Sequence, residues 1–133
     1  MNTSKPLIYS CSGCSSAAQM ANYLAVRIDR AGIADMSCIA GVGGGVRKLV
    51  RTASSGRKII VIDGCPLACS RACLSQHDLV PDLHIDLSTF DVSKKEHEDF
   101  DLWEADEIFE LLKGKLMDES YGSSGLFTFI DHS

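Results

Sequence analysis

The fold is decided by one stretch of the chain, Lys58-Ile59-Ile60-Val61-Ile62-Asp63-Gly64-Cys65-Pro66-Leu67-Ala68-Cys69. Its first half is continuously apolar and rich in β-branched residues, which is typical of a central parallel strand that is covered on both faces. A turn follows, and Pro66 favours the first turn of a helix, where its missing N–H has no intrahelical partner. We therefore predict a strand over 58–63 and a helix that contains Cys65 and Cys69 and runs to about His77.

An earlier unit with the same order of elements begins at residue 6. The apolar run 6–10 ends in the motif Cys11-Ser12-Gly13-Cys14, and Ser15 is a good N-cap residue for a helix. Small and apolar residues then recur at spacings of three and four. Gly32 ends this pattern, because glycine readily adopts the left-handed conformation that follows a helix. We predict a strand over 6–10 and a helix between Ser15 and Gly32.

A second unit lies between these two. The run 36–40 contains Cys38 and leads into the glycine-rich stretch Gly41-Val42-Gly43-Gly44-Gly45, which precedes a helix predicted over 46–53. The glycines resemble a phosphate-binding loop, but Val46 stands where a dinucleotide fingerprint requires its third glycine. A tight turn beside the cysteines is the favoured interpretation. A nucleotide-binding interaction domain remains a third and weaker hypothesis for the chain.

The last third of the chain is more polar. A weaker strand over 83–87 is followed by an acidic loop over 91–101 and by an amphipathic helix, which is marked by Trp103, Ile108, Leu111, Leu112 and Leu116. We assign residues 1–119 to a single domain and residues 120–133 to a C-terminal tail. The tail contains the apolar run 126–130, which we expect to add an edge strand or to dock on a protein partner.

Alternation of strands and helices predicts an α/β fold. We expect a three-layer sandwich with a parallel sheet of about four strands, Rossmann-like or flavodoxin-like in character. Such sheets bind ligands at the carboxyl ends of their strands. Five of the six cysteines follow a predicted strand, and they are Cys11, Cys14, Cys38, Cys65 and Cys69. The cysteines are therefore predicted to gather at the carboxyl edge of the sheet.

Composition excludes several classes of protein. The chain has 133 residues, of which 45% are hydrophobic and 23% charged, as expected for one soluble globular domain rather than a disordered or fibrous protein. An integral membrane protein is not expected, because no apolar run is long enough to span a bilayer. The net charge is −5, without a basic stripe, so nucleic-acid binding is not expected either. No secretory leader pattern is visible, which favours the cytoplasm, where clustered cysteines commonly bind metal or do redox chemistry.

Two cysteine pairs form the candidate metal site. The pair Cys11 and Cys14 alone fits half a zinc site, a thioredoxin-like redox pair or two ligands of an iron–sulfur cluster. Together with Cys65 and Cys69, it supplies the four thiolates of a tetrahedral zinc site. Cys38 is a candidate additional ligand or redox partner, although a small core residue is the simpler interpretation.

Three other residues bear on the site. We expect Cys73 to serve packing, because helical drift moves it off the face of the two cysteines before it. Asp63 is predicted either to orient a ligand thiol or to be an ordinary turn aspartate. His97 lies in a run of charged residues, which favours a solvated surface over a cover for the site.

The motif Ile62-Asp63-Gly64-Cys65-Pro66-Leu67-Ala68-Cys69 resembles the central segment of the DGC-domain family, which is named for its Asp-Gly-Cys. The stretches 9–15, 36–43 and 97–101 also resemble segments of that family, in the same order and at similar spacing. The resemblance covers most of residues 6–101. It implies zinc binding by four cysteines, and by motif this role is carried over to Cys11, Cys14, Cys65 and Cys69.

Two classes of function remain open on these residues. The favoured one is a zinc-binding protein, with a cysteine-thiolate cluster that senses or carries the metal ion, and an iron–sulfur cluster on the same cysteines is a variant of it. The alternative is a thiol redox or sulfur-transfer enzyme, in which Cys14 or Cys65 attacks and a neighbouring thiol resolves the mixed disulfide. No reaction can be named, because no acid, base or nucleophilic hydroxyl is convincingly placed.

Overall fold

The structure is a computed structural model that describes residues 5–118. The tail predicted over 120–133 lies outside the described residues. The elements along the chain are β1 (Leu7–Ser10), α1 (Ser16–Arg30), β2 (Asp35–Met36), α2 (Ile39–Gly43), α3 (Arg47–Ala53), β3 (Ile59–Asp63), α4 (Cys69–Ser75), β4 (Leu83–Asp86), a 3₁₀ helix η1 (Leu87–Phe90) and α5 (Leu102–Leu116).

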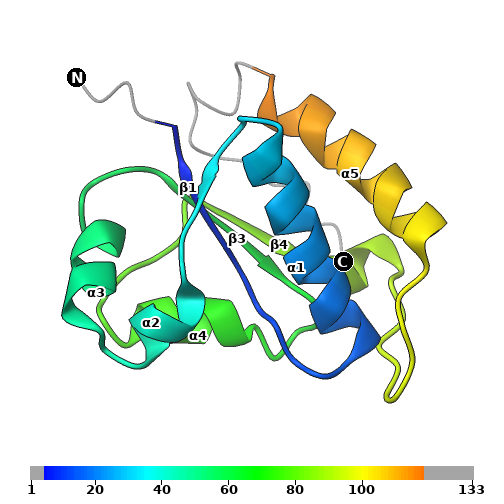
Figure 1. Ribbon diagram of the computed structural model, residues 1–133, viewed down its shortest axis with the longest axis horizontal. Helices are drawn as coiled ribbons and strands as arrows, with labels where there is room; N and C mark the ends of the chain where they lie inside the picture. The colour runs from blue at the N-terminus through cyan, green and yellow to red at the C-terminus, as the bar shows by residue number, and fades with distance from the viewer. Residues whose placement is uncertain (1–4, 119–133) are drawn as a thin grey trace.

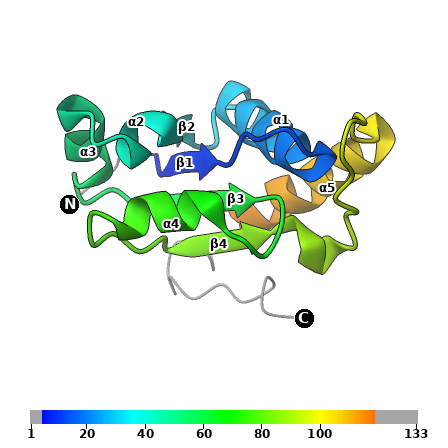
Figure 2. The same ribbon diagram turned by 90° about the horizontal axis from the view of Figure 1, so that it is seen from below.

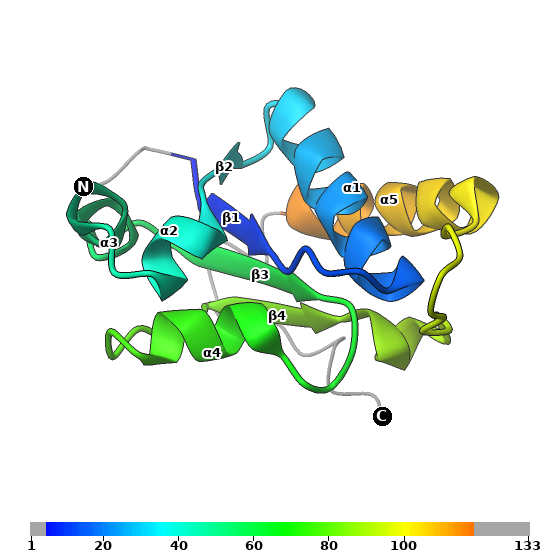
Figure 3. The ribbon, with the colours of Figure 1, turned by 60° about the horizontal axis from the view of Figure 1, so that its bottom comes forward.

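The four strands form one parallel sheet in the order β2-β1-β3-β4, which confirms the predicted α/β fold. The central strands β1 and β3 pair over their length, with Ser10 opposite Ile62. In Figure 3 the arrowheads of β1, β3 and β4 point the same way. The turns that follow these strands therefore emerge at one edge of the sheet.

Helices cover both faces of this sheet (Figure 1). On one face α1 and α5 lie side by side (Figure 2) and pack against Ile8, Ile60 and Ile62. On the other face α2, α3 and α4 pack against Tyr9 and Val61. Because side chains alternate along a strand, the continuously apolar β1 and β3 supply both layers, as expected for strands that are covered on both sides.

The boundaries of α1 agree with the sequence prediction. The hydroxyl of Ser15 accepts a hydrogen bond from the backbone N–H of Ala18 at 3.1 Å and so caps the helix. Ala31 is the C-cap residue, and Gly32 follows it in the left-handed region with φ of +77°. The cap and the glycine therefore define this helix from the sequence alone.

The second unit differs from its prediction. Only Asp35 and Met36 form β2, and the first glycines that were predicted to make a tight turn belong instead to α2. Gly41 lets α2 and α3 pack closely, since a Cβ at this position would lie 2.0 Å from Leu49 Cδ1. Cys38 is the N-cap residue of α2 and is exposed.

The helix predicted to contain both Cys65 and Cys69 is also different. It begins only at Cys69 and ends at Ser75, because Ala68 adopts a left-handed conformation with φ of +53° and interrupts the helix before it. Residues 64–67 form a turn instead. The prediction that the two cysteines share one helical face was therefore wrong.

The helix α5 is amphipathic as predicted, but its apolar face is narrower. Ile108, Leu112 and Leu116 are buried, whereas Trp103 is 84% exposed and Leu111 is 47% exposed. One residue corresponds to about 100° of rotation around a helix, so Leu111 points away from α1 when Leu112 faces it. Within residues 5–118 no helix is long and apolar enough to cross a membrane.

Candidate functional site

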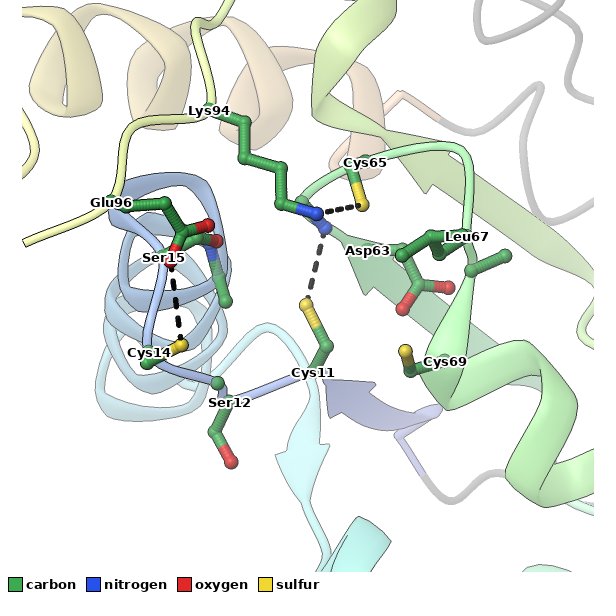
Figure 4. A pocket seen from close by; sticks show the side chains of 14 residues that line it. Cys11, Ser12, Cys14, Ser15, Asp63, Cys65, Leu67, Cys69, Lys94 and Glu96 are labelled. Carbon is green, nitrogen blue, oxygen red and sulfur yellow. Dashed lines mark hydrogen bonds between the residues drawn. The ribbon is translucent and has the colours of Figure 1, made fainter.

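A pocket of about 230 Å³ lies at the carboxyl edge of the sheet (Figure 4). Its walls come from the turn after β1, the turn after β3 and the loop that follows η1. All four cysteines that were predicted as metal ligands line this pocket: Cys11, Cys14, Cys65 and Cys69. Chain segments that lie 53 positions apart in the sequence, such as Cys11 and Gly64, thus meet here because β1 and β3 are neighbours in the sheet.

Cys11 lies deepest in this group. Its backbone N–H donates to the carbonyl oxygen of Ile62 at 3.2 Å, which extends the pairing of β1 and β3 by one residue. Its Sγ accepts a hydrogen bond from the backbone N–H of Gly64 at 3.2 Å. Burial raises the pKa of the Cys11 thiol to about 11, and the charges of Asp63, Cys69 and Cys65 act in the same direction. Cys11 is therefore a neutral thiol near pH 7.

The loop after η1 contacts two other sulfurs of the pocket. The thiol of Cys14 donates to Oε1 of Glu96 at 3.8 Å, and Nζ of Lys94 donates to Sγ of Cys65 at 3.6 Å. Figure 4 shows Cys14 on the side of α1 beside Glu96, whereas Cys11, Cys65 and Cys69 surround the centre of the view. Lys94 and Glu96 were not predicted as site residues, because their loop was interpreted as a solvated charge run.

Asp63 does more than close a turn. Its carboxylate is 1% exposed and accepts hydrogen bonds from the backbone N–H groups of Ser70, at 2.9 Å, and Arg71, at 3.4 Å. Nε2 of His84 lies 2.8 Å from Oδ2, the carboxylate oxygen that also accepts from Arg71. Asp63 thus fixes the first turn of α4, where Cys69 lies. His84 was missed because it has no ligand spacing with any cysteine, although β3 and β4 make it a neighbour.

The pattern of the DGC domain matches residues 7–112. The chain belongs to the DGC domain family. It is 55% identical over 104 residues to a protein of Pseudomonas aeruginosa named "Anaerobic and virulence modulator AnvM", and this alignment covers 78% of the chain and 79% of the relative. No solved structure matches the chain.

Three further residues of this DGC domain protein lie outside the pocket. Cys38 is exposed at the start of α2, so its interpretation as a small core residue was wrong. Cys73 is half-buried, and its Sγ packs so closely on Gly43 that a Cβ there would lie 2.8 Å away. Burial raises the pKa of the Cys73 thiol, as expected for a packing residue. His97 also lies outside the pocket lining, although Glu96 beside it takes part.

The donors in the pocket of the DGC domain suit a soft metal, because zinc and iron–sulfur clusters are commonly held by four cysteine thiolates. As the side chains stand, however, residues 5–118 contain no group of three or more His, Cys, Asp or Glu side chains that could hold a metal ion. The sulfur of Cys14 contacts Oε1 of Glu96 on the α1 side of the pocket. The residues therefore fit a metal by their chemistry, and the sulfurs have to rotate before they can share one.

Proposed function

We propose that this DGC domain protein binds zinc through the cysteines of the pocket. Cys11, Cys65 and Cys69 supply three of the ligands in this proposal, and Cys14 supplies the fourth. The observation that supports the proposal best is the meeting of two distant cysteine pairs at one pocket. An iron–sulfur cluster on the same four sulfurs is the variant of this proposal.

Charge gives the physical reason. The thiolate form of Cys11 is opposed by burial and by the negative charges of Asp63 and of the other pocket sulfurs. A divalent cation offsets this repulsion and allows the thiols to release their protons, so metal binding and deprotonation are coupled. The role of Asp63 in this scheme is to hold α4 through its hydrogen bonds rather than to bind the metal.

The pocket is open to solvent at the end of the strands and is not enclosed in the core, which favours a metal that is sensed or carried over one that only stabilises the fold. The relative AnvM is named as an anaerobic and virulence modulator. We extend a modulating role to this chain and propose that the metal-bound and metal-free forms of the pocket are the two states of this regulation.

The test is purification of the full chain without oxygen, followed by elemental analysis, an absorption spectrum and a count of free thiols. We expect one zinc per chain and no visible colour. Replacement of Cys11 and Cys65 together by Ser should abolish zinc binding, whereas Cys38→Ser, which lies outside the pocket, should retain it. A coloured protein that contains iron would establish the cluster variant, and a metal-free protein that takes up neither metal would contradict the proposal.

A thiol redox or sulfur-transfer enzyme is the second candidate, and one contact favours it. The ammonium group of Lys94 at Sγ of Cys65 is the positive charge that a nucleophilic thiolate would pair with. In that reaction the thiolate of Cys65 attacks a substrate disulfide, one substrate sulfur leaves as a thiolate, and a neighbouring pocket thiol displaces the other. Metal-free protein should then form a reversible disulfide between pocket cysteines, which mass spectrometry of non-reduced peptides detects.

A further inference from the structure

Among residues 5–118, the hydrogen bonds that hold the middle of the loop over the pocket come from one serine. We call residues 92–96 the strap. Three hydrogen bonds join the strap to Ser16, the first residue of α1. The backbone N–H of Ser16 donates to the carbonyl oxygen of Lys95 at 2.9 Å, its hydroxyl donates to the carbonyl oxygen of Ser93 at 3.3 Å, and the same hydroxyl accepts from the N–H of Lys95 at 2.9 Å. Ser16 is 3% exposed, so water does not compete freely for these groups.

The ends of the strap are bent and only one of them is anchored in the core. Val92 is buried among the side chains beneath α5. Asp91 and His97, which flank the strap, both have φ of +62°. A left-handed conformation costs a non-glycine residue free energy and is kept only where the surroundings enforce it. Between its two bends, the strap therefore depends on Ser16 for its position.

The strap in turn fixes two sulfurs of the pocket. Lys94 and Glu96 lie two positions apart in the strap. Lys94 contacts Cys65, and Glu96 contacts Cys14. These contacts lie on opposite sides of the pocket: in Figure 4, Cys14 lies beside Glu96 on the side of α1, and Cys65 lies across the view from it. The positions of these two sulfurs are thus coupled to the docking of the strap.

We propose that Ser16 is a positioning residue of the cysteine site. By holding the strap against α1, Ser16 keeps Lys94 in contact with Cys65 and Glu96 in contact with Cys14. Release of the strap removes these contacts and frees the two cysteine side chains to turn into the pocket. A second part of the proposal is that release of the strap speeds zinc uptake, and this zinc part rests on the proposed function. The positional part concerns the metal-free protein and stands or falls separately.

The positional part is tested by the rate at which a bulky maleimide labels Cys65 in the metal-free full chain, with each cysteine quantified by mass spectrometry of its peptide. Exposed Cys38 is the reference within the same molecule. Ser16→Ala removes two of the three hydrogen bonds, and the loss of two bonds of ordinary strength corresponds to about a tenfold shift or more in an opening equilibrium. We expect labelling of Cys65 relative to Cys38 to rise about tenfold.

Two further variants separate positioning from a general loss of packing. Ser16→Thr keeps the hydroxyl and should label close to the wild-type rate. Thr52→Val removes a comparable bond, from Thr52 Oγ1 to the carbonyl oxygen of Lys48, but in α3, outside the pocket, and should also leave Cys65 unchanged. Labelling of Cys65 that is the same in Ser16→Ala as in the wild type would overturn the proposal.

A second measurement addresses zinc. If the strap holds the sulfurs apart, Ser16→Ala should take up zinc several-fold faster than the wild type, measured by stopped-flow displacement of a coloured zinc indicator. Uptake at or below the wild-type rate would overturn the zinc part. If the wild type binds no zinc, the proposed function fails, and the maleimide rates alone decide whether Ser16 positions the strap.

Discussion

Asp63 links the cysteine pocket to the helix behind it. Two backbone N–H groups of α4 and the ring of His84 depend on its buried carboxylate. Asp63→Ala leaves these donors without a partner, so we expect the free energy of unfolding to fall by about 1–3 kcal/mol, measured by urea denaturation. Asp86→Ala is the matched control, because that carboxylate also accepts a backbone N–H, from Ser88, but is accessible to solvent. Equal losses in both variants would show that burial of Asp63 is unimportant.

The raised pKa of Cys11 has a consequence for stability at alkaline pH. The folded protein keeps the Cys11 proton up to about pH 11, whereas the unfolded chain releases it near the ordinary value of 9.0. The stabilisation is thus complete below about pH 9 and is lost as the pH rises towards about 11, because the unfolded state then binds fewer protons. In metal-free protein, urea titrations across this range should show a steeper decline for the wild type than for Cys11→Ser. Cys38→Ser, at an exposed site, should follow the wild type.

Single residues also show the limit of sequence interpretation. The four pocket cysteines could be predicted, because each follows an apolar run that reads as a strand. Lys94 and Glu96 could not, since 29 and 82 residues separate them from Cys65 and Cys14. A run of charged residues does not indicate which charged side chain will contact a turn that is distant in the sequence. Their contacts exist only once the strap has docked on α1.

At the scale of elements, Gly64 sets how closely the turn after β3 approaches α1. A Cβ at this position would lie 2.6 Å from the carbonyl carbon of Ala17 and 2.8 Å from the N of Ala18, and backbone atoms cannot yield as a flexible side chain does. Gly64→Ala should therefore destabilise the fold by about 1–3 kcal/mol or more. In α5, Gly114→Ala adds the same methyl group in open space and should be neutral or stabilising, by up to about 1 kcal/mol. Thermal unfolding of the two variants side by side distinguishes these outcomes.

The start of α4 shows why element boundaries were harder to predict than elements. Pro66 and the spacing of the cysteines favoured a helix from Cys65, and local preference alone supports that start. The observed start is determined by Asp63, whose carboxylate meets the N–H groups of Ser70 and Arg71 and so selects the later turn. A left-handed Ala68 is the local cost of this arrangement. The hydrogen bonds to the buried carboxylate of Asp63 thus determined the start of α4, against the local preference for a helix from Cys65.

At the scale of the whole molecule, the order of apolar runs and turns was sufficient to predict a parallel α/β sandwich. The residues that α5 buries were not predicted correctly, since the sequence does not determine by inspection how α5 is rotated against α1. Trp103 and Leu111 fit the periodicity of an apolar face but remain exposed, because contact with α1 passes through Ile108 and Leu112.

The docking of α5 supplies a test of this packing. Leu112 is fully buried, whereas its neighbour Leu111 is 47% exposed. Leu112→Ala removes a core side chain and should cost about 2–5 kcal/mol. Leu111→Ala makes the same chemical change on the outer side of the same turn, so it should cost clearly less. Urea midpoints that shift equally would contradict the placement of α5.

The bond from the Cys11 amide to the Ile62 carbonyl is the last one between the two central strands, at the carboxyl end of the pairing of β1 and β3. It also spans the two cysteine-bearing turns, so neither turn can drift from the other while these strands stay paired. The amide proton of Cys11 should accordingly exchange with deuterium only when the ends of β1 and β3 separate. The backbones of the two cysteine-bearing turns therefore stay together even when the cysteine side chains rotate.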